Sequence, residues 1–428
     1  MHRLFEYSKE LLIRFKRDSL FQNSIYLMLS TGVMAAFGFV FWIICSRLFT
    51  PQDVGLATAF ISAVSLVSGL SMLGFNNSII RFLPTSDRKD DQISTAIIIT
   101  IIANLLAGSI FLLWAITTHS PIIKDTATFW WVLLFILYLW VGSLNTVIES
   151  VFIAYRATIY IVFKNTLFSI LKLLLPLLLF SIGAFAIIGS ITIALAISLG
   201  IGLVWLTTKF NYRPLLHINA TVIREIYTFA AGNYVGNLFS MLPGTLVPLI
   251  VLSRLGAKEA AFFYMPMMII SFLNIIPSAS AQSLFAEVSH DEKELATHLK
   301  SSLKHLSLII LPAGGAIVFF GAFVLSFFGP IYAQEGALPL QILVIASLFG
   351  ALNYFGDTLL NIKKRMNLYI FMNAFNALII VILVYYMAPR GLAAVATASL
   401  IGQIITLVVY FVINWRLVGE FWTTTRTT

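Results

Sequence analysis

Twelve long apolar runs divide the chain, and they constrain its fold more than any other feature. A helix needs about 20 apolar residues to cross the hydrocarbon core of a bilayer, and the runs have about this length. We predict spans at residues 22–46, 54–79, 93–117, 129–154, 165–182, 184–207, 229–252, 260–286, 306–328, 338–361, 367–388 and 392–414. The expected fold is therefore an all-α integral membrane protein with 12 transmembrane helices.

The composition of the chain supports an integral membrane protein. Only 11% of the residues are charged, whereas a soluble domain has about 25%. The net charge of +9 does not indicate nucleic-acid binding, because the basic residues form short clusters between apolar runs. The single cysteine, Cys45, lies in an apolar stretch and excludes an intrachain disulfide.

The distribution of basic residues predicts the topology. Of the 27 Lys and Arg residues, 21 lie in the N-terminal segment, the even-numbered loops and the C-terminal tail, and 5 lie in the odd-numbered loops. Lys172 is the single basic residue that this assignment places within a span. Because cytoplasmic loops carry the excess of Lys and Arg, we expect both termini in the cytoplasm. Residues 1–21 have no signal-peptide pattern and predict a basic amphipathic helix on the cytoplasmic surface.

Polar residues repeat between the two halves of the chain. At an offset of 208, Asn145, Glu149, Arg156 and Asn165 correspond to Asn353, Asp357, Lys364 and Asn373. The stretch SRL recurs at 46–48 and 253–255, and Asn76 corresponds to Gln282. We predict two parallel-repeat six-helix bundles, residues 22–210 and 229–416, joined by a cytoplasmic linker at 211–228 and followed by a cytoplasmic tail at 417–428.

Three of these polar positions share one face of a helix in each half. Asn145, Glu149 and Arg156 follow the spacing i, i+4, i+11, and so do their counterparts in the second half. A charge facing lipid is costly, so this face should meet protein or water. Two interpretations remain open here: a polar wall of a transport cavity, or ion pairs that hold the helices together.

A family resemblance rests on residues 46–84, SRLFTPQDVGLATAFISAVSLVSGLSMLGFNNSIIRFLP, and on the twelve-span layout. This stretch resembles the first two helices of the polysaccharide-biosynthesis, or Wzx-type O-antigen, flippases of the multidrug/oligosaccharidyl-lipid/polysaccharide exporter superfamily. The resemblance implies a MATE-like V shape in the cell membrane. It also implies flipping of a polyprenyl-diphosphate-linked oligosaccharide from the cytoplasmic to the outer leaflet by alternating access. The implied partners are this substrate, membrane lipids and other polysaccharide-assembly proteins.

A diphosphate head group requires cations, and its sugars require hydrogen-bonding groups. Lys172 is the main cation candidate, with a snorkelling lysine as the alternative. The remaining candidates for the substrate cavity are the repeat-related Arg47 and Arg254, and the amides Asn76, Gln282, Asn145 and Asn353. For each amide the alternative is a hydrogen bond that holds two helices together.

Four charged residues are candidates for gating or ion coupling. Arg81 and Glu287 are repeat-related with opposite charge and would form an inner gate; the alternative is a plain topology signal. Glu149 and Asp357 are candidates for coupling to a cation.

The leading alternative function is a cation-coupled multidrug exporter on the same scaffold. Acidic residues deep in the first half would favour it, and Glu149, near a helix end, is the single one there. A membrane glycosyltransferase and a non-transporting scaffold of a synthesis complex are further alternatives. The sequence has no GxxxxGK[ST], HExxH or CxxC motif, so we expect no enzyme activity, metal site or cofactor.

Overall fold

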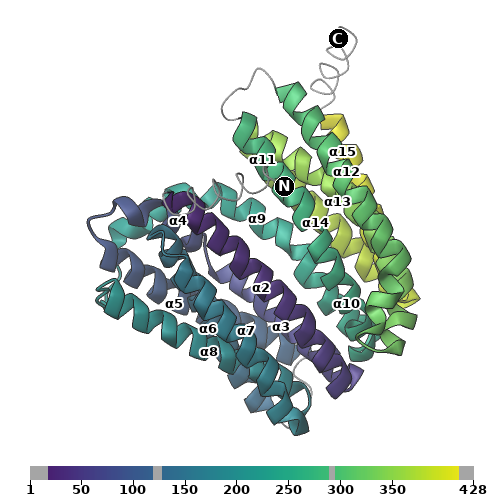
Figure 1. Cartoon of the computed structure of the whole chain (residues 1–428), viewed down its shortest axis with the longest axis horizontal. Helices are drawn as coiled ribbons and strands as arrows, with labels where there is room; N and C mark the ends of the chain where they lie inside the picture. The colour runs from purple at the N-terminus through teal and green to yellow at the C-terminus, as the bar shows by residue number, and fades with distance from the viewer. Residues whose placement is uncertain (1–17, 119–127, 289–294, 414–428) are drawn as a thin grey trace, which may run out of the picture. The chain divides into compact units, whose positions relative to one another are not determined.

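The computed structural model describes residues 18–118, 128–288 and 295–413, which form α-helices joined by short connections (Figure 1). In the first half the helices are α2 (Ser19–Leu48), α3 (Pro51–Ser71), α4 (Phe75–Phe82), α5 (Lys89–Thr117), α6 (Thr128–Ala154), α7 (Ile159–Leu179) and α8 (Ala184–Lys209). In the second half they are α9 (Ala220–Leu255), α10 (Ala257–Leu273), α11 (Ile275–Val288), α12 (Leu295–Ser326), α13 (Pro330–Ile362), α14 (Met366–Met387) and α15 (Leu392–Ile413).

Twelve helical segments of the described residues are long and apolar enough to cross a membrane, which confirms the predicted number. The second span differs in detail, because Leu73 and Gly74 have φ angles of 49° and 79° and separate α3 from α4. The eighth span is divided between α10 and α11 at Asn274. The predicted amphipathic helix at 1–21 and the tail at 417–428 fall mainly or wholly on residues outside the described ranges.

The ends of the helices reproduce the repeat. Arg156 and Lys364, 208 residues apart, have φ angles of 54° and 55° just after α6 and α13. The next amide donates back across the turn in both halves, from Ala157 to Phe152 O at 2.8 Å and from Arg365 to Leu360 O at 2.9 Å. This left-handed C-terminal cap ends each helix at the equivalent position. Arg156 and Lys364 therefore lie beyond the helix and do not extend the polar face predicted from spacing.

Two compact units make up the chain, and residues 50–66 group with the second one. In the first unit α7 packs between α2 and α8, and α6 contacts α4, α5 and α8. In the second unit α13 contacts α10, α11, α12, α14 and α15. Within that unit a Cβ atom at Gly55 would come 1.6 Å from the Ala257 carbonyl oxygen, so glycine alone permits this approach of α3 to the start of α10.

Large apolar side chains remain exposed along the spans. Leu178 is 75% exposed and Phe319 is 84% exposed. An apolar surface of this extent is unfavourable in water and favourable against lipid tails. The exposed apolar side chains and the span lengths together describe a multi-pass membrane protein.

Candidate functional site

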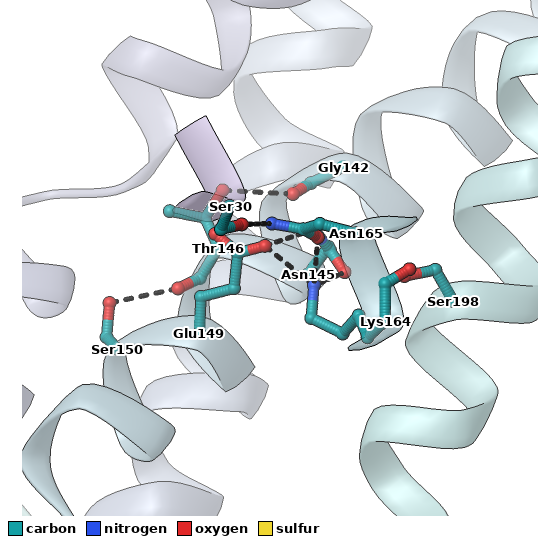
Figure 2. Close-up of polar contacts among 9 residues, drawn as sticks. All are labelled: Ser30, Gly142, Asn145, Thr146, Glu149, Ser150, Lys164, Asn165 and Ser198. Atoms are coloured by element: carbon teal, nitrogen blue, oxygen red, sulfur yellow. Dashed lines mark hydrogen bonds and ion pairs between the residues drawn. The ribbon is translucent and has the colours of Figure 1, made fainter. Parts of the chain in front are cut away.

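A buried lysine organises the polar cluster of the first unit (Figure 2). Lys164, on the second turn of α7, is fully buried. Its Nζ lies 2.6 Å from both Glu149 Oε1 and Asn145 Oδ1, and 3.1 Å from Asn165 Oδ1. Asn165 Nδ2 donates to Ser30 Oγ on α2 at 3.1 Å. The cluster therefore links α2, α6 and α7 through hydrogen bonds and one ion pair.

The local sequence explains how this cluster forms. Asn145 and Glu149 are four residues apart on α6, so they present their oxygens on one face. Gly202 on α8 lies beside the lysine stem, since a Cβ atom there would be in ordinary contact with Lys164 Cδ at 3.5 Å. A buried ammonium needs a compensating charge and filled hydrogen bonds, and the cluster supplies both. Among the described residues, the polar face of α6 is thus engaged in an interhelical ion pair.

The second unit places the equivalent carboxylate in different surroundings. Asp357 accepts hydrogen bonds from Tyr410 and, at 2.8 Å, from Asn373 Nδ2. Met372 stands 208 residues after Lys164, so the position of the lysine is apolar here. Asn353 Nδ2 donates to Gln403 Oε1 at 2.7 Å. The carboxylate of this half is therefore held by neutral donors among the described residues.

A cavity of about 320 Å³ lies beside this carboxylate, within the second unit. Its polar lining includes Asp357, Asn353, Asn373, Asn376 and Gln403. A second hollow of about 470 Å³ shares lining residues with it and reaches Gln282. Three of the residues predicted from the sequence, Asn353, Asp357 and Gln282, thus line adjoining hollows.

Lys172 has a different environment in the first unit. It is 8% exposed, and its Nζ lies 5.1 Å from the ring centroid of Phe41 and 5.0 Å from that of Phe168. Aromatic faces attract an ammonium group but do not neutralise its charge. No ion pair joins this ammonium to another described residue. Lys172 is therefore a buried lysine with aromatic neighbours and, among the described residues, no ion-pair partner.

Comparison with known proteins identifies the family. Residues 44–332, about two thirds of the chain, match the profile of the polysaccharide biosynthesis proteins. The chain belongs to this family. A "Putative O-antigen transporter" of Shigella flexneri is 29% identical over 140 residues, which are 32% of this chain and 34% of that protein. The match thus spans about a third of this curated relative.

Solved structures support the fold of this polysaccharide biosynthesis protein. An inward-facing multidrug resistance MATE family transporter of the MOP superfamily is similar over 94% of this chain and 99% of its own, with a TM-score of 0.70 and 15% identity. A MOP superfamily transporter from Pyrococcus furiosus is similar over 94% and 96%, with a TM-score of 0.65 and 15% identity. These likenesses confirm the predicted MATE-like, twelve-helix fold class.

The remaining predicted residues lie apart from these clusters within their own units. Arg47 is exposed in the last turn of α2, and Asn76 is half-buried on α4. Arg254 lies 3.7 Å from the ring centroid of Tyr385. For the predicted gate, Arg81 is exposed on α4 and lies 5.6 Å from the Phe82 ring, and Glu287 pairs with His298 Nδ1 at 3.0 Å. The roles of these residues stay predictions.

Sequence reasoning missed three residues of the two clusters. Lys164 was assigned to a loop because the fifth span was predicted to begin at residue 165, whereas α7 begins at Ile159. Lys172 is therefore not alone within the span. Tyr410 and Gln403 were missed because neither has a polar counterpart at an offset of 208, where Gly202 and Leu195 stand. Among the described residues, no group of three or more His, Cys, Asp or Glu side chains is placed to hold a metal ion.

Proposed function

We propose that this polysaccharide biosynthesis protein flips a polyprenyl-diphosphate-linked oligosaccharide from the cytoplasmic to the outer leaflet of the cell membrane. The observation that carries the proposal is the family match over residues 44–332. The local similarity to an O-antigen transporter supports the same substrate class. Alternating access of the two bundles is the proposed mechanism, as the MATE-like fold suggests.

Lys172 is the proposed contact for the diphosphate. A phosphate oxygen needs charge-assisted donors, and an ammonium without a carboxylate partner supplies them. The surrounding Phe41 and Phe168 rings hold the ammonium without cancelling its charge. Arg47, Arg254 and the amides Asn76 and Asn145 remain secondary candidates for contact with the head group.

Export of organic cations is the competing function. Such a substrate needs a carboxylate that is free to compensate its charge. In the first unit the acidic candidate, Glu149, is already neutralised by Lys164 at 2.6 Å. This pairing favours the flippase. Asp357 stays the candidate for coupling to a cation, and the flippase is proposed to act as a transporter with no catalytic role, alongside other assembly proteins of the membrane.

A leaflet-sidedness assay in proteoliposomes tests the proposal. We expect the wild-type protein to move the lipid-linked oligosaccharide across the bilayer. Lys172→Met should lower the flipping rate by about tenfold or more, because a charge-assisted hydrogen bond to the diphosphate is lost. Lys172→Arg, which keeps the charge, should retain most of the rate. Lys363→Met, at an exposed position beyond α13, is the matched control.

One result would contradict this function, and a second would contradict the role of Lys172. Transport of a hydrophobic cation without movement of the lipid-linked oligosaccharide would assign the chain to the exporters. Wild-type flipping by Lys172→Met would remove Lys172 from the site and leave it as a snorkelling lysine.

A further inference from the structure

The cavity of the second unit has the size of a small-molecule site. Its volume of about 320 Å³ falls at the lower end of the roughly 300–1,000 Å³ that such sites occupy. One water molecule takes about 30 Å³ in the liquid, so the cavity holds far more than a bare ion. Ser271, Asn274 and Tyr354 also line the second hollow, so the polar surface continues toward Gln282.

One hydrogen-bond acceptor in the lining of this cavity receives no hydrogen bond from the described residues. Asn353 is 6% exposed, and its Oδ1 has no hydrogen-bond partner among the described residues. Its Nδ2 is held by Gln403, which fixes the direction of the amide. An acceptor buried without a partner costs about 1–3 kcal/mol. This oxygen is closed off in the present conformation, so a ligand that reached it after a shift of the Asn353 side chain would recover that free energy.

The charge of the lining disfavours an anionic ligand. The described residues that line the cavity include one carboxylate, Asp357, and no lysine or arginine. Asp357 Oδ1 already accepts from Tyr410 and Asn373. The other polar groups are neutral amides and hydroxyls, such as Asn376 and Ser399. Neutral groups with one carboxylate suit a ligand rich in hydroxyl groups.

Aromatic side chains complete the site. Phe263 and Tyr354 line the same cavity as the amides. A sugar ring presents hydroxyl groups at its edge and C–H groups on its faces, so it matches amides together with aromatic rings.

The first unit differs at the equivalent positions. Lys164 stands where the second unit has Met372, and its Nζ is held by Asn145 and Glu149 of α6. Lys172 replaces Ile380, which lines the cavity in the second unit. One half thus presents an ammonium, and the other presents neutral polar groups and a carboxylate.

We propose that the cavity lined by Asn353, Asp357 and Gln403 binds one sugar ring of the transported head group. The inference rests on the proposed flippase function and names the part of the substrate that this half recognises. Asn353 Oδ1 accepts from a sugar hydroxyl, and the free oxygen surface of Asp357 accepts from a second one. Tyr354 contacts the face of the ring.

Protection of an introduced cysteine tests this site. In a Cys45→Ala background, Ser399→Cys and Ser240→Cys each place a thiol in the lining, and Ser253→Cys is the exposed control outside it. The probes are the lipid-linked oligosaccharide from the cells that make this chain, the glycan released from it by mild acid, sugar-free polyprenyl diphosphate, and sodium chloride against choline chloride. The readout is the rate of alkylation by a small maleimide in proteoliposomes.

We expect the lipid-linked oligosaccharide and the released glycan to slow alkylation at Cys-substituted positions 399 and 240 and not at position 253. Adding Asn353→Leu should raise the glycan concentration for half-protection by about tenfold, because the unpartnered acceptor is removed. Protection by sodium or by sugar-free polyprenyl diphosphate, or no protection by either glycan, would overturn the sugar site. The flipping rate of the wild-type protein in the same vesicles tests the proposed flippase function separately. Failure of the sugar site can therefore be distinguished from failure of that function.

Discussion

At the scale of single residues, Lys164 shows how a charge is accommodated inside an apolar bundle. Removing an ammonium from water costs several kcal/mol, which a partner charge and filled hydrogen bonds must offset. Three side-chain oxygens surround Nζ at 2.6–3.1 Å, and one belongs to a carboxylate. The Glu149 side chain is 27% exposed while that of Lys164 is 0% exposed, so the lysine depends on the pair more than the glutamate does.

A double-mutant cycle tests this asymmetry. Glu149→Gln should lower the free energy of unfolding by about 3 kcal/mol, because it leaves a buried, uncompensated charge. Lys164→Met, which copies the residue at position 372, should lower the free energy of unfolding by less. The glutamate left without a partner is 27% exposed and can be solvated. The double variant should be more stable than Glu149→Gln alone. Unfolding in mixed detergent–SDS micelles, followed by tryptophan fluorescence, measures all three.

Thr146→Ala is the matched control for this cycle. Thr146 is exposed on the same helix and donates only to the Gly142 carbonyl at 3.1 Å, as Figure 2 shows. Its replacement should change stability by less than about 0.5 kcal/mol. Additive effects of Glu149→Gln and Lys164→Met would contradict a coupled pair.

At the scale of elements, the two halves pack equivalent helices with reversed side-chain sizes. In the first unit Ile148 on α6 faces Gly202 on α8. In the second unit Gly356 on α13 faces Tyr410 on α15. The partners stand 208 residues apart, so one large and one small residue are exchanged between the helices. The exchange lets Tyr410 reach Asp357 where the first unit uses Lys164.

Gly356→Ala tests this packing. The added Cβ would lie 2.7 Å from Tyr410 Cδ1, and Tyr410 is held by its hydrogen bond to Asp357. We expect a cost of about 1–3 kcal/mol and a lower melting temperature in detergent. Gly200→Ala on α8, with no atom within 4 Å of the new Cβ, should be neutral or stabilising.

A compensating pair provides the second test of the same contact. Gly356→Ile combined with Tyr410→Gly copies the arrangement of Ile148 and Gly202. This double variant should melt at a higher temperature than Gly356→Ile alone. A double variant less stable than either single one would show that the sizes are not exchangeable.

At the scale of the whole molecule, the repeat and the charge distribution predict one topology. Each half has seven described helices in the same order, and these make six spans. An even number of spans returns the chain to the side of the membrane from which it started. Several basic residues counted in loops lie within helices of the structure, such as Lys89 at the start of α5 and Lys164 on the second turn of α7. The excess of Lys and Arg in the N-terminal segment, even-numbered loops and tail remains large.

Reporter fusions measure this topology. Green fluorescent protein fused after the last residue should fluoresce in bacteria, and alkaline phosphatase at the same site should be inactive, because the C-terminus is predicted in the cytoplasm. Fusions after Gly256, between α9 and α10, should give the opposite pair of signals. An active phosphatase at the C-terminus would contradict the predicted topology.

Much of the architecture could be predicted from the sequence, because span length and residue spacing are properties of short stretches of the chain. Hydrophobic length predicted twelve spans to within several residues. Offset matching singled out Asn353 and Asp357, and only the structure shows that both line one cavity of the second unit. The breaks at Leu73–Gly74 and at Asn274 were not predicted, because the apolar runs continue through them. Lys164 was misplaced because the fifth span was predicted to begin at residue 165, whereas α7 begins at Ile159.

The sequence by itself determined the membrane class, the number of spans and the twofold repeat, because each depends on residues that are near in the chain or on their spacing. Only the tertiary structure decided that Glu149 pairs with Lys164, that Tyr410 replaces this pair in the second half, and that a cavity opens beside Asp357. These contacts depend on how each helix is rotated about its axis and on the volumes of side chains from distant helices. Hydrophobic length carries no information about either quantity.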